Sequence, residues 1–86
     1  MALHYTVRLK RSAERELRRL PRDNIPRILS RMQQLASQPR PPGCKKLTDE
    51  EEYRVRQGDF RILYTVDDQQ RLVEVVKIAH RREVYR

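Results

Sequence analysis

Three arginines in the stretch YRVRQGDFRILY, residues 53–64, have a spacing suited to binding phosphate. Apolar and polar residues alternate on both sides of Gly58 and Asp59, which predicts a β-hairpin with a two-residue turn. In that register Arg56 lies directly opposite Arg61, and Arg54 is one pleat away. Like charges in this position destabilise a sheet unless an anion or acidic neighbours compensate. Each planar guanidinium can bind phosphate oxygens with two hydrogen bonds, so the strand face is either a phosphate-binding surface or an ordinary solvated face.

A second group of reactive side chains follows in HRREVY, where His80, Arg81 and Tyr85 stand close together in the sequence. The chain has no Gly-rich phosphate loop, no Ser/His/Asp set and no metal-ligand spacing, and Cys44 is its single cysteine. The remaining set fits metal-free RNA cleavage, because the RNA 2′-hydroxyl is itself the nucleophile. Arginines can then neutralise the charge that grows on the phosphoryl oxygens.

Such cleavage also needs a base and an acid. Tyr85 is one candidate, although its ordinary pKa of about 10 makes it a poor base unless cations such as Arg61 and Arg81 lower it. The alternative for Tyr85 is an aromatic that packs the end of the chain on the sheet. His80 is a possible acid or base, although a histidine at a strand end is more often structural.

The composition indicates a polyanionic partner. The chain has 86 residues, a net charge of +8 and a pI of about 10.4, and sixteen of its twenty basic residues are Arg. Nucleic acid, an acidic protein or an anionic membrane surface would satisfy this charge. No segment is long and apolar enough to span a membrane, and no signal peptide follows the first methionine. We therefore expect one cytoplasmic domain over residues 1–86 that does not act at a membrane.

The remaining pattern predicts the elements that hold these residues. A strand is expected over residues 4–9, a helix from an N-cap at Ser12 to Pro21, and a second helix from a cap at Asp23 or Asn24 to Pro39. Another strand is expected over residues 72–79, with Val75 paired to Ile62. The order β-α-α-β-β-β predicts an α+β fold, a helical hairpin packed on one face of a small, mainly antiparallel curved sheet. The arginines would lie on the open face.

Charge is concentrated in the first half of the chain. Residues 1–48 carry twelve basic and three acidic side chains. We expect RNA binding by basic residues of the two helices and of the segment that follows them. These are Arg18, Arg22, Arg27, Lys45 and Lys46.

The two motifs together resemble the signature of the RelE/ParE toxin superfamily, and so do the first strand, the basic helices and Lys46-Leu47. The resemblance covers essentially the whole chain. It implies a RelE-like fold and the toxin of a type II toxin–antitoxin system. RelE toxins are ribosome-dependent endoribonucleases that cut mRNA in the A site, and the resemblance implies no cofactor. It also implies a hetero-oligomer with a cognate, RelB-like antitoxin that is acidic and partly disordered.

By this resemblance Arg61, Arg81 and Tyr85 match catalytic positions of the family. We expect Arg54 and Arg56 to be catalytic residues as well, and they fall where well-known RelE members have lysines. Because arginine cannot act as a base, a lysine's role elsewhere in the family would pass here to Tyr85, His80 or Lys46. The glycine that often follows the Lys-Leu pair is replaced by Thr48-Asp49.

Two other functions share the same sequence features. One is a ParE-like toxin that inhibits DNA gyrase and cleaves nothing, and the other is a non-catalytic basic RNA-binding module. ParE members generally lack the full Arg/Tyr set, so the ending Val84-Tyr85 favours the RelE-type activity.

Overall fold

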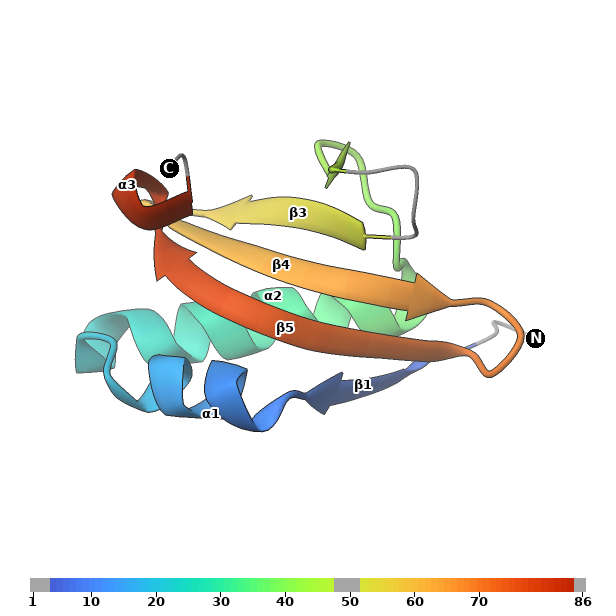
Figure 1. Cartoon of the computed structure of the whole chain (residues 1–86), viewed down its shortest axis with the longest axis horizontal. Coiled ribbons are helices and arrows are strands. Elements are labelled where there is room, and N and C mark those ends of the chain that lie inside the picture. Colours follow the sequence, from blue (N-terminus) through green and yellow to red (C-terminus); the bar gives the residue numbers. More distant parts are fainter. Residues whose placement is uncertain (1–3, 48–51, 85–86) are drawn as a thin grey trace.

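The computed structural model describes residues 4–47 and 52–84, which form one mixed sheet with two main helices against it (Figure 1). The elements are β1 (Thr6–Leu9), α1 (Arg11–Arg18), the 3-10 helix η1 (Arg22–Asn24), α2 (Ile25–Ser37), β2 (Lys45–Lys46), β3 (Glu52–Gln57), β4 (Phe60–Asp67), β5 (Leu72–His80) and α3 (Arg81–Val84). The strand order is β1-β5-β4-β3-β2, with β1 parallel to β5 and the other pairs antiparallel. The predicted α+β architecture is confirmed, and the structure adds the short elements β2 and α3.

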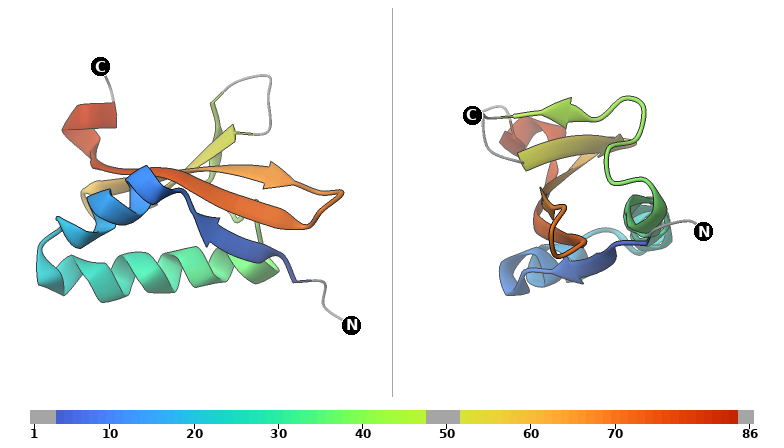
Figure 2. Two further views of the ribbon diagram at one scale, coloured as in Figure 1. Left: turned by 60° about the horizontal axis from the view of Figure 1, so that its bottom comes forward. Right: turned by 90° about the vertical axis from the view of Figure 1, so that its right-hand side faces the viewer.

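Both long helices cover the same face of the sheet, whereas α3 rises from the opposite face (Figure 2). The core lies between the helices and the sheet and is built from the apolar side of each element. Its largest fully buried side chains are Tyr64, Ile28, Leu35, Ile62, Ile78, Val55, Val73 and Val75. The helical spacing of residues 28, 32 and 35 and the alternation of the strands therefore account for the core.

The predicted cap of the first helix is wrong, and that of the second is right in position only. Lys10, not Ser12, occupies the N-cap position of α1, and among the described residues no side chain forms a capping hydrogen bond at the start of α1 or α2. The backbone N–H of Lys10 donates to Val75 O at 2.9 Å, so pairing with β5 keeps Lys10 extended and the helix begins directly after it. Asn24 stands at the N-cap position of α2, but η1 leads straight into the helix, and Asn24 has helical backbone angles.

The register of the β3–β4 hairpin is as predicted. Gln57 pairs with Phe60, and Arg56 pairs with Arg61. Gly58 has a φ of +60°, which suits the first central position of a two-residue hairpin turn and favours glycine there. The alternation of residues 53–64 thus fixes which side chains face the helices and which face away.

The predicted register of β5 is wrong. Ile62 pairs with Ile78 rather than Val75, because the β4–β5 turn lies later than expected and a bulge interrupts the pairing at Leu63 and Tyr64. The helix α1 packs along β5 beyond the bulge. There Glu16 accepts a hydrogen bond from the N–H of Ile78 at 3.0 Å and another from Lys77 Nζ at 3.1 Å. Because β1 ends opposite Val75, Glu16 covers a part of β5 that β1 does not reach.

A polar cluster lies at the end of the sheet that is opposite to the β3–β4 turn. Arg40 donates to both oxygens of Asp68, at 3.1 and 2.9 Å, and its Nε donates to Tyr53 Oη at 2.8 Å. Tyr5 Oη donates to Asp68 Oδ1 at 2.6 Å. These bonds lower the pKa of Asp68, with Arg40 as the larger cause, and the bond to Asp68 raises the pKa of Tyr5. The cluster ties the linker after α2 to the β4–β5 turn.

Candidate phosphate-binding face

Four basic residues on three neighbouring strands share the sheet face that points away from the helices. Lys45 pairs with Arg54, Arg56 lies one pleat further along β3, and Arg61 lies opposite Arg56 on β4. We call Lys45, Arg54, Arg56 and Arg61 the basic face. It occupies the end of the open sheet face nearest the β3–β4 turn.

Arg61 departs from the expectation of three exposed guanidiniums, because its side chain is buried and only 4% of the residue is exposed. Its Nη1 donates to Gly58 O at 3.2 Å and to Phe60 O at 3.0 Å. Its Nε has no hydrogen-bond partner, and no carboxylate in residues 4–47 and 52–84 forms an ion pair with it. A buried cation without a counter-ion is costly, so this site favours an incoming anion.

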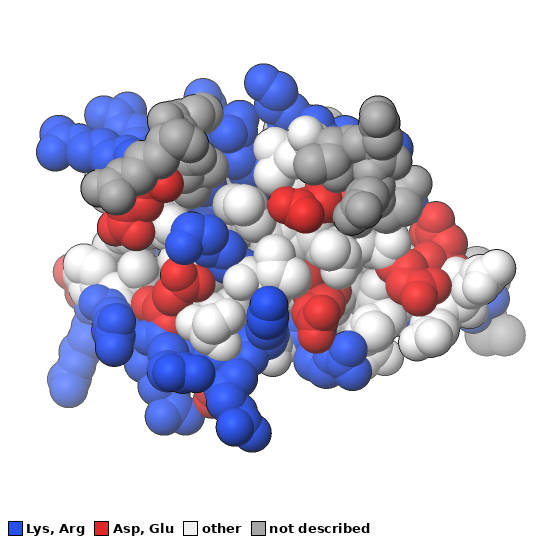
Figure 3. Space-filling view, viewed as in Figure 1, with Lys and Arg blue, Asp and Glu red and all other residues white. Residues whose placement is uncertain are grey.

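The open face is polarised along its strands. Arg56 is exposed at one end, while Glu52, Asp67 and Glu74 lie on the same face towards the other end. Arg8 of β1 pairs with Glu74, with 3.2 Å between its Nη2 and Glu74 Oε2. From the viewpoint of Figure 3, Lys and Arg gather over α1 and along the upper edge, with acidic residues between them. A polyanion is therefore attracted to the basic end of the face.

The structure brings Arg81 to the same end as Arg56 and Arg61. Arg81 opens α3, and its backbone N–H donates to Asp59 O in the β3–β4 turn at 2.8 Å. This bond attaches α3 to the turn that carries Gly58, the residue to which Arg61 donates. Tyr85 lies outside the described residues, so its predicted position beside the arginines stays a prediction.

The structure does not bring His80 to the basic face. His80 pairs with Phe60, whose side chain points to the helix side of the sheet, and the two rings meet edge to face with centroids 5.7 Å apart. Its Nδ1 accepts a hydrogen bond from the backbone N–H of Arg82 at 3.2 Å. The imidazole is thus separated from Arg61 by the sheet itself. Another tyrosine is also excluded as a base, because burial raises the pKa of Tyr64 and its hydroxyl donates to Pro39 O at 2.7 Å.

The residues expected to bind RNA are spread over the molecule. Lys45 belongs to the basic face, whereas Lys46 pairs with Tyr53 and points to the other side of the sheet. Arg18 is exposed and forms an ion pair with Glu14 at 2.9 Å. Arg22 begins η1, and Arg27 lies on α2. These residues do not form one site.

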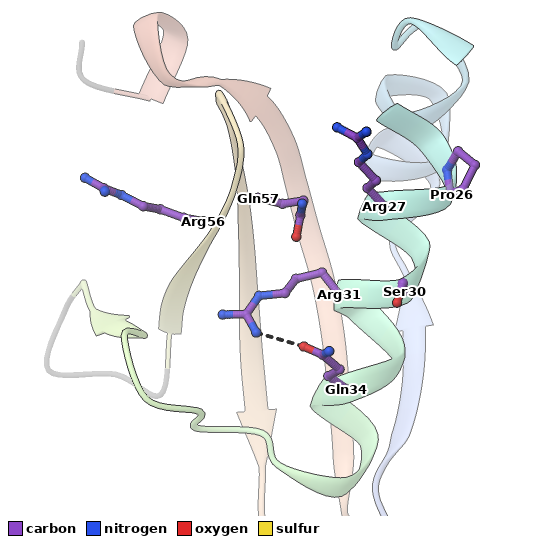
Figure 4. A pocket seen from close by; sticks show the side chains of 7 residues that line it. All are labelled: Pro26, Arg27, Ser30, Arg31, Gln34, Arg56 and Gln57. Carbon is purple, nitrogen blue, oxygen red and sulfur yellow. Dashed lines mark hydrogen bonds between the residues drawn. The ribbon is translucent and has the colours of Figure 1, made fainter. Parts of the chain in front are cut away.

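A groove between α2 and β3 was missed by the sequence reasoning (Figure 4). It has a volume of about 500 Å³ and is lined by Pro26, Arg27, Ser30, Arg31, Gln34, Arg56 and Gln57. Two signals could have identified it. Arg27 and Arg31 are one helical turn apart, and residues 24–48 contain no acidic residue.

Two features are absent from residues 4–47 and 52–84. No cluster of three or more His, Cys, Asp or Glu side chains is arranged to hold a metal ion. No helix in this part of the chain has the length and apolar character needed to cross a membrane.

This fold occurs in a family of bacterial and archaeal toxins. The family model of the ParE toxin of the type II toxin–antitoxin system parDE matches residues 7–85, and the chain belongs to this RelE/ParE toxin family. Toxin RelG of Mycobacterium tuberculosis is 35% identical in an alignment 89 positions long, which covers 95% of this chain and 97% of RelG.

Solved structures agree with this assignment. The toxin–antitoxin complex RelBE2 of M. tuberculosis contains a chain that matches with a TM-score of 0.81 and 28% identity, over 93% of this chain and 94% of that one. The archaeal RelE–RelB complex of Pyrococcus horikoshii matches with a TM-score of 0.78 and 25% identity, over 94% and 97% of the two chains. The isolated RelE toxin of E. coli matches with a TM-score of 0.80, over 94% and 90%, and its 22% identity shows the shared fold alone.

Proposed function

We propose that this toxin is a ribosome-dependent endoribonuclease that cleaves mRNA in the A site and works in the cytoplasm, where its target is. The observation that carries the proposal is Arg61, a buried guanidinium without a carboxylate partner among the described residues, beside Arg56 and at the end of the sheet where Arg81 begins α3. Membership of the RelE/ParE family supports it independently.

The proposed chemistry uses the RNA's own nucleophile. The 2′-hydroxyl oxygen forms a bond to the adjacent phosphorus, the bond from phosphorus to the 5′-oxygen breaks, and a 2′,3′-cyclic phosphate and a free 5′-hydroxyl result. The proton of the 2′-hydroxyl goes to a base, and an acid protonates the 5′-oxygen. Arg61 and Arg81 neutralise the charge on the phosphoryl oxygens, while Arg54 and Arg56 bind the flanking phosphates.

Tyr85 is the proposed proton-transfer residue, on the strength of the family resemblance alone. Its role as the acid is chemically easier, because a neutral phenol needs no lowering of its pKa to donate a proton. His80 is the weaker candidate, since its ring lies on the helix side of the sheet. Because positions 54 and 56 are arginines, Lys46 is the lysine that would serve as the base by the resemblance. It too points away from the basic face.

Binding of phosphate would supply a counter-charge that Arg61 does not find in residues 4–47 and 52–84. In the free protein its Nη1 is held by two neutral carbonyl oxygens, of Gly58 and Phe60, and α3 contacts the strands that carry this end of the open face. A phosphate that reaches Arg61 therefore displaces weaker partners and gains a charge-assisted hydrogen bond.

We also propose that a RelB-like antitoxin neutralises this toxin in a hetero-oligomer. Relatives from M. tuberculosis and P. horikoshii were solved as complexes of RelE with RelB. The net charge of +8 suits an acidic segment that becomes ordered on binding. Expressed alone in a bacterium, this chain should arrest growth, and an adjacent small acidic reading frame should rescue it.

In vitro translation with primer-extension mapping tests the activity. Cuts in phase with codons, seen only in translated mRNA, support the proposal. Arg61→Ala and Arg81→Ala should each lower the rate by about 100- to 1000-fold while antitoxin binding is retained. A double variant that cuts like the wild type would show that neither arginine holds the scissile phosphate.

A ParE-like inhibitor of DNA gyrase is the second candidate, because the family model that matches is that of ParE. Incubation with gyrase and supercoiled DNA would then yield covalent gyrase–DNA adducts, and translated mRNA would stay intact. If neither cuts nor adducts are seen, the function that remains is that of a non-catalytic RNA-binding module.

A further inference from the structure

The groove between α2 and β3 is strongly cationic. Among the residues that line it, Arg27, Arg31 and Arg56 are positive and none is acidic. Neither Arg27 nor Arg31 forms an ion pair with a carboxylate in the part of the chain that the structure describes. The situation on α1 differs, because Glu14 offsets Arg18.

The groove is also organised to present hydrogen-bond donors. Arg31 is half-buried and reaches from α2 towards β3 (Figure 4). Its Nη1 donates to Oε1 of Gln34, also on α2, at 2.8 Å. Because the carbonyl oxygen of Gln34 accepts this bond, its amide N–H groups remain to bind a ligand. Gln57 points towards α2 from the opposite wall, so amides and guanidiniums meet an occupant from both sides.

The lining favours phosphate groups over an acidic peptide. Peptides that dock in grooves normally insert apolar side chains into apolar pockets, and Pro26 is the one apolar residue of this lining. Arg27 and Arg31 are separated by four residues, a rise of about 6 Å along the helix, which is comparable to the spacing of successive phosphates along a nucleic-acid strand. Guanidinium forks bind such phosphates with two hydrogen bonds.

The position of the groove connects it to the basic face. Residues Arg56 and Gln57 are neighbours on β3, and their side chains leave the strand on opposite faces of the sheet, with Arg56 pointing away from α2 (Figure 4). The pairing of β2 with β3 covers only Tyr53 and Arg54, so β2 does not extend along this end of β3. One RNA strand can therefore pass over the edge of β3 and touch both surfaces.

We propose that the groove between α2 and β3 is a second RNA-binding site, which holds phosphates of an RNA strand by Arg27, Arg31 and the amides of Gln34 and Gln57. It is separate from the site of cleavage and rests on the proposed function only in taking RNA as the polyanion. Arg56 lies between the two sites, and its guanidinium points to the basic face.

The test measures binding of a single-stranded 2′-O-methyl RNA, which lacks the nucleophile and cannot be cut. The variant Arg27→Gln/Arg31→Gln is compared with Arg11→Gln/Arg15→Gln, which removes the same charge from exposed positions of α1 on the β5 side of the sheet. Each lost phosphate contact should lower the slope of log K against log salt by about 0.7, which is about fivefold in affinity at 0.1 M salt. The groove variant should therefore bind about 25-fold more weakly, and the α1 variant less than about threefold.

Three further measurements keep the result interpretable. Thermal melting followed by circular dichroism checks that each variant is folded, and Arg27→Lys/Arg31→Lys should recover most of the salt dependence because the charges return. An acidic peptide rich in Glu and Leu is titrated in parallel as the competing ligand. The proposal is overturned if the groove and α1 variants bind RNA equally well, or if the groove variant loses the peptide and keeps the RNA.

The outcome is independent of the cleavage assay. Loss of RNA binding in the groove variant, with no codon-phased cuts by the wild type, would retain the groove and reject the ribonuclease. Codon-phased cuts that depend on Arg61, with unchanged RNA binding by the groove variant, would retain the ribonuclease and reject the groove.

Discussion

Replacing Arg61 by methionine should make the protein more stable and less active. Methionine has an unbranched side chain like that of arginine, carries no charge, and adapts to irregular apolar surroundings. The residue is 4% exposed, and its guanidinium has two neutral carbonyl partners and an unpartnered Nε. Among the residues that the structure describes, this charge has lost its water without gaining a counter-ion.

The size of the effect follows from two opposing contributions. Removing a buried charge recovers a desolvation cost of several kcal/mol. Losing the two hydrogen bonds of Nη1, to Gly58 O and Phe60 O, costs about 1.5–3 kcal/mol for each bond, since both are made by a charged donor. Relief of the repulsion with Arg56 across the strands contributes a gain of about 0.2–1 kcal/mol. Replacing buried ionic groups by apolar side chains of similar volume changes stability by about 0 to +4 kcal/mol in total. Within that range we expect a net gain of about 1–2 kcal/mol, or roughly 4–15 °C in melting temperature for a domain of this size.

Urea denaturation of the purified protein measures the free energy of unfolding, and single-turnover cleavage on programmed ribosomes measures activity. The control is Arg56→Met, which removes the partner charge from an exposed position and should change stability by less than about 1 kcal/mol. For Arg61→Met the cleavage rate should fall by about 100- to 1000-fold. A loss of stability above 1 kcal/mol would refute the reasoning, since it would mean that the fold depends on the guanidinium.

Three other substitutions test the contacts that shape the sheet. Glu16→Ala leaves the N–H of Ile78 without its acceptor and should lower the free energy of unfolding by about 1–2 kcal/mol, while Glu16→Gln, which keeps an acceptor, should lose less in urea denaturation. Asp68→Asn should weaken the link to Arg40 at neutral pH. Because the folded-state pKa of Asp68 is lowered, this contribution to stability is present above a pH of about 4 and is lost as the pH falls. The melting temperature of the variant should therefore fall less steeply than that of the wild type as the pH is lowered through this range. Tyr64→Phe removes the hydroxyl that donates to Pro39 O and should lower the free energy of unfolding by about 1–2 kcal/mol, measured by calorimetry. An unchanged free energy of unfolding would mean that water replaces the bond without loss.

The parts of the fold set by local pattern could be predicted from the sequence. Alternation over residues 53–64 and one glycine at the turn specify the hairpin register, because a slip by one residue would expose its whole apolar side. The cap of the first helix could not be predicted, since Lys10 is held extended by its bond to Val75, a contact distant in sequence.

The site was predictable in its members but not in its geometry. Strand alternation puts Arg56 and Arg61 on one face, yet it does not reveal that Arg61 is buried near α3. Strand alternation likewise does not reveal the bulge in the pairing of β4 with β5, which shifts the register beyond Tyr64. A histidine that alternation alone leaves unassigned, His80, therefore lies on the helix side.

The parallel pairing of β1 with β5 has a consequence for how the chain folds. Thr6 lies beside Leu72, so the strand at one edge of the sheet can form only after the last strand has been synthesised. The helix α1 also packs on β5, and its Glu16 bonds to residues 77 and 78. Contacts over such long sequence separations slow folding, because the loop must close before they contribute any stability. The nascent chain therefore lacks a complete core until β5 has joined β1, and a fragment that stops before residue 72 should be unable to form either the basic face or the sheet that supports it.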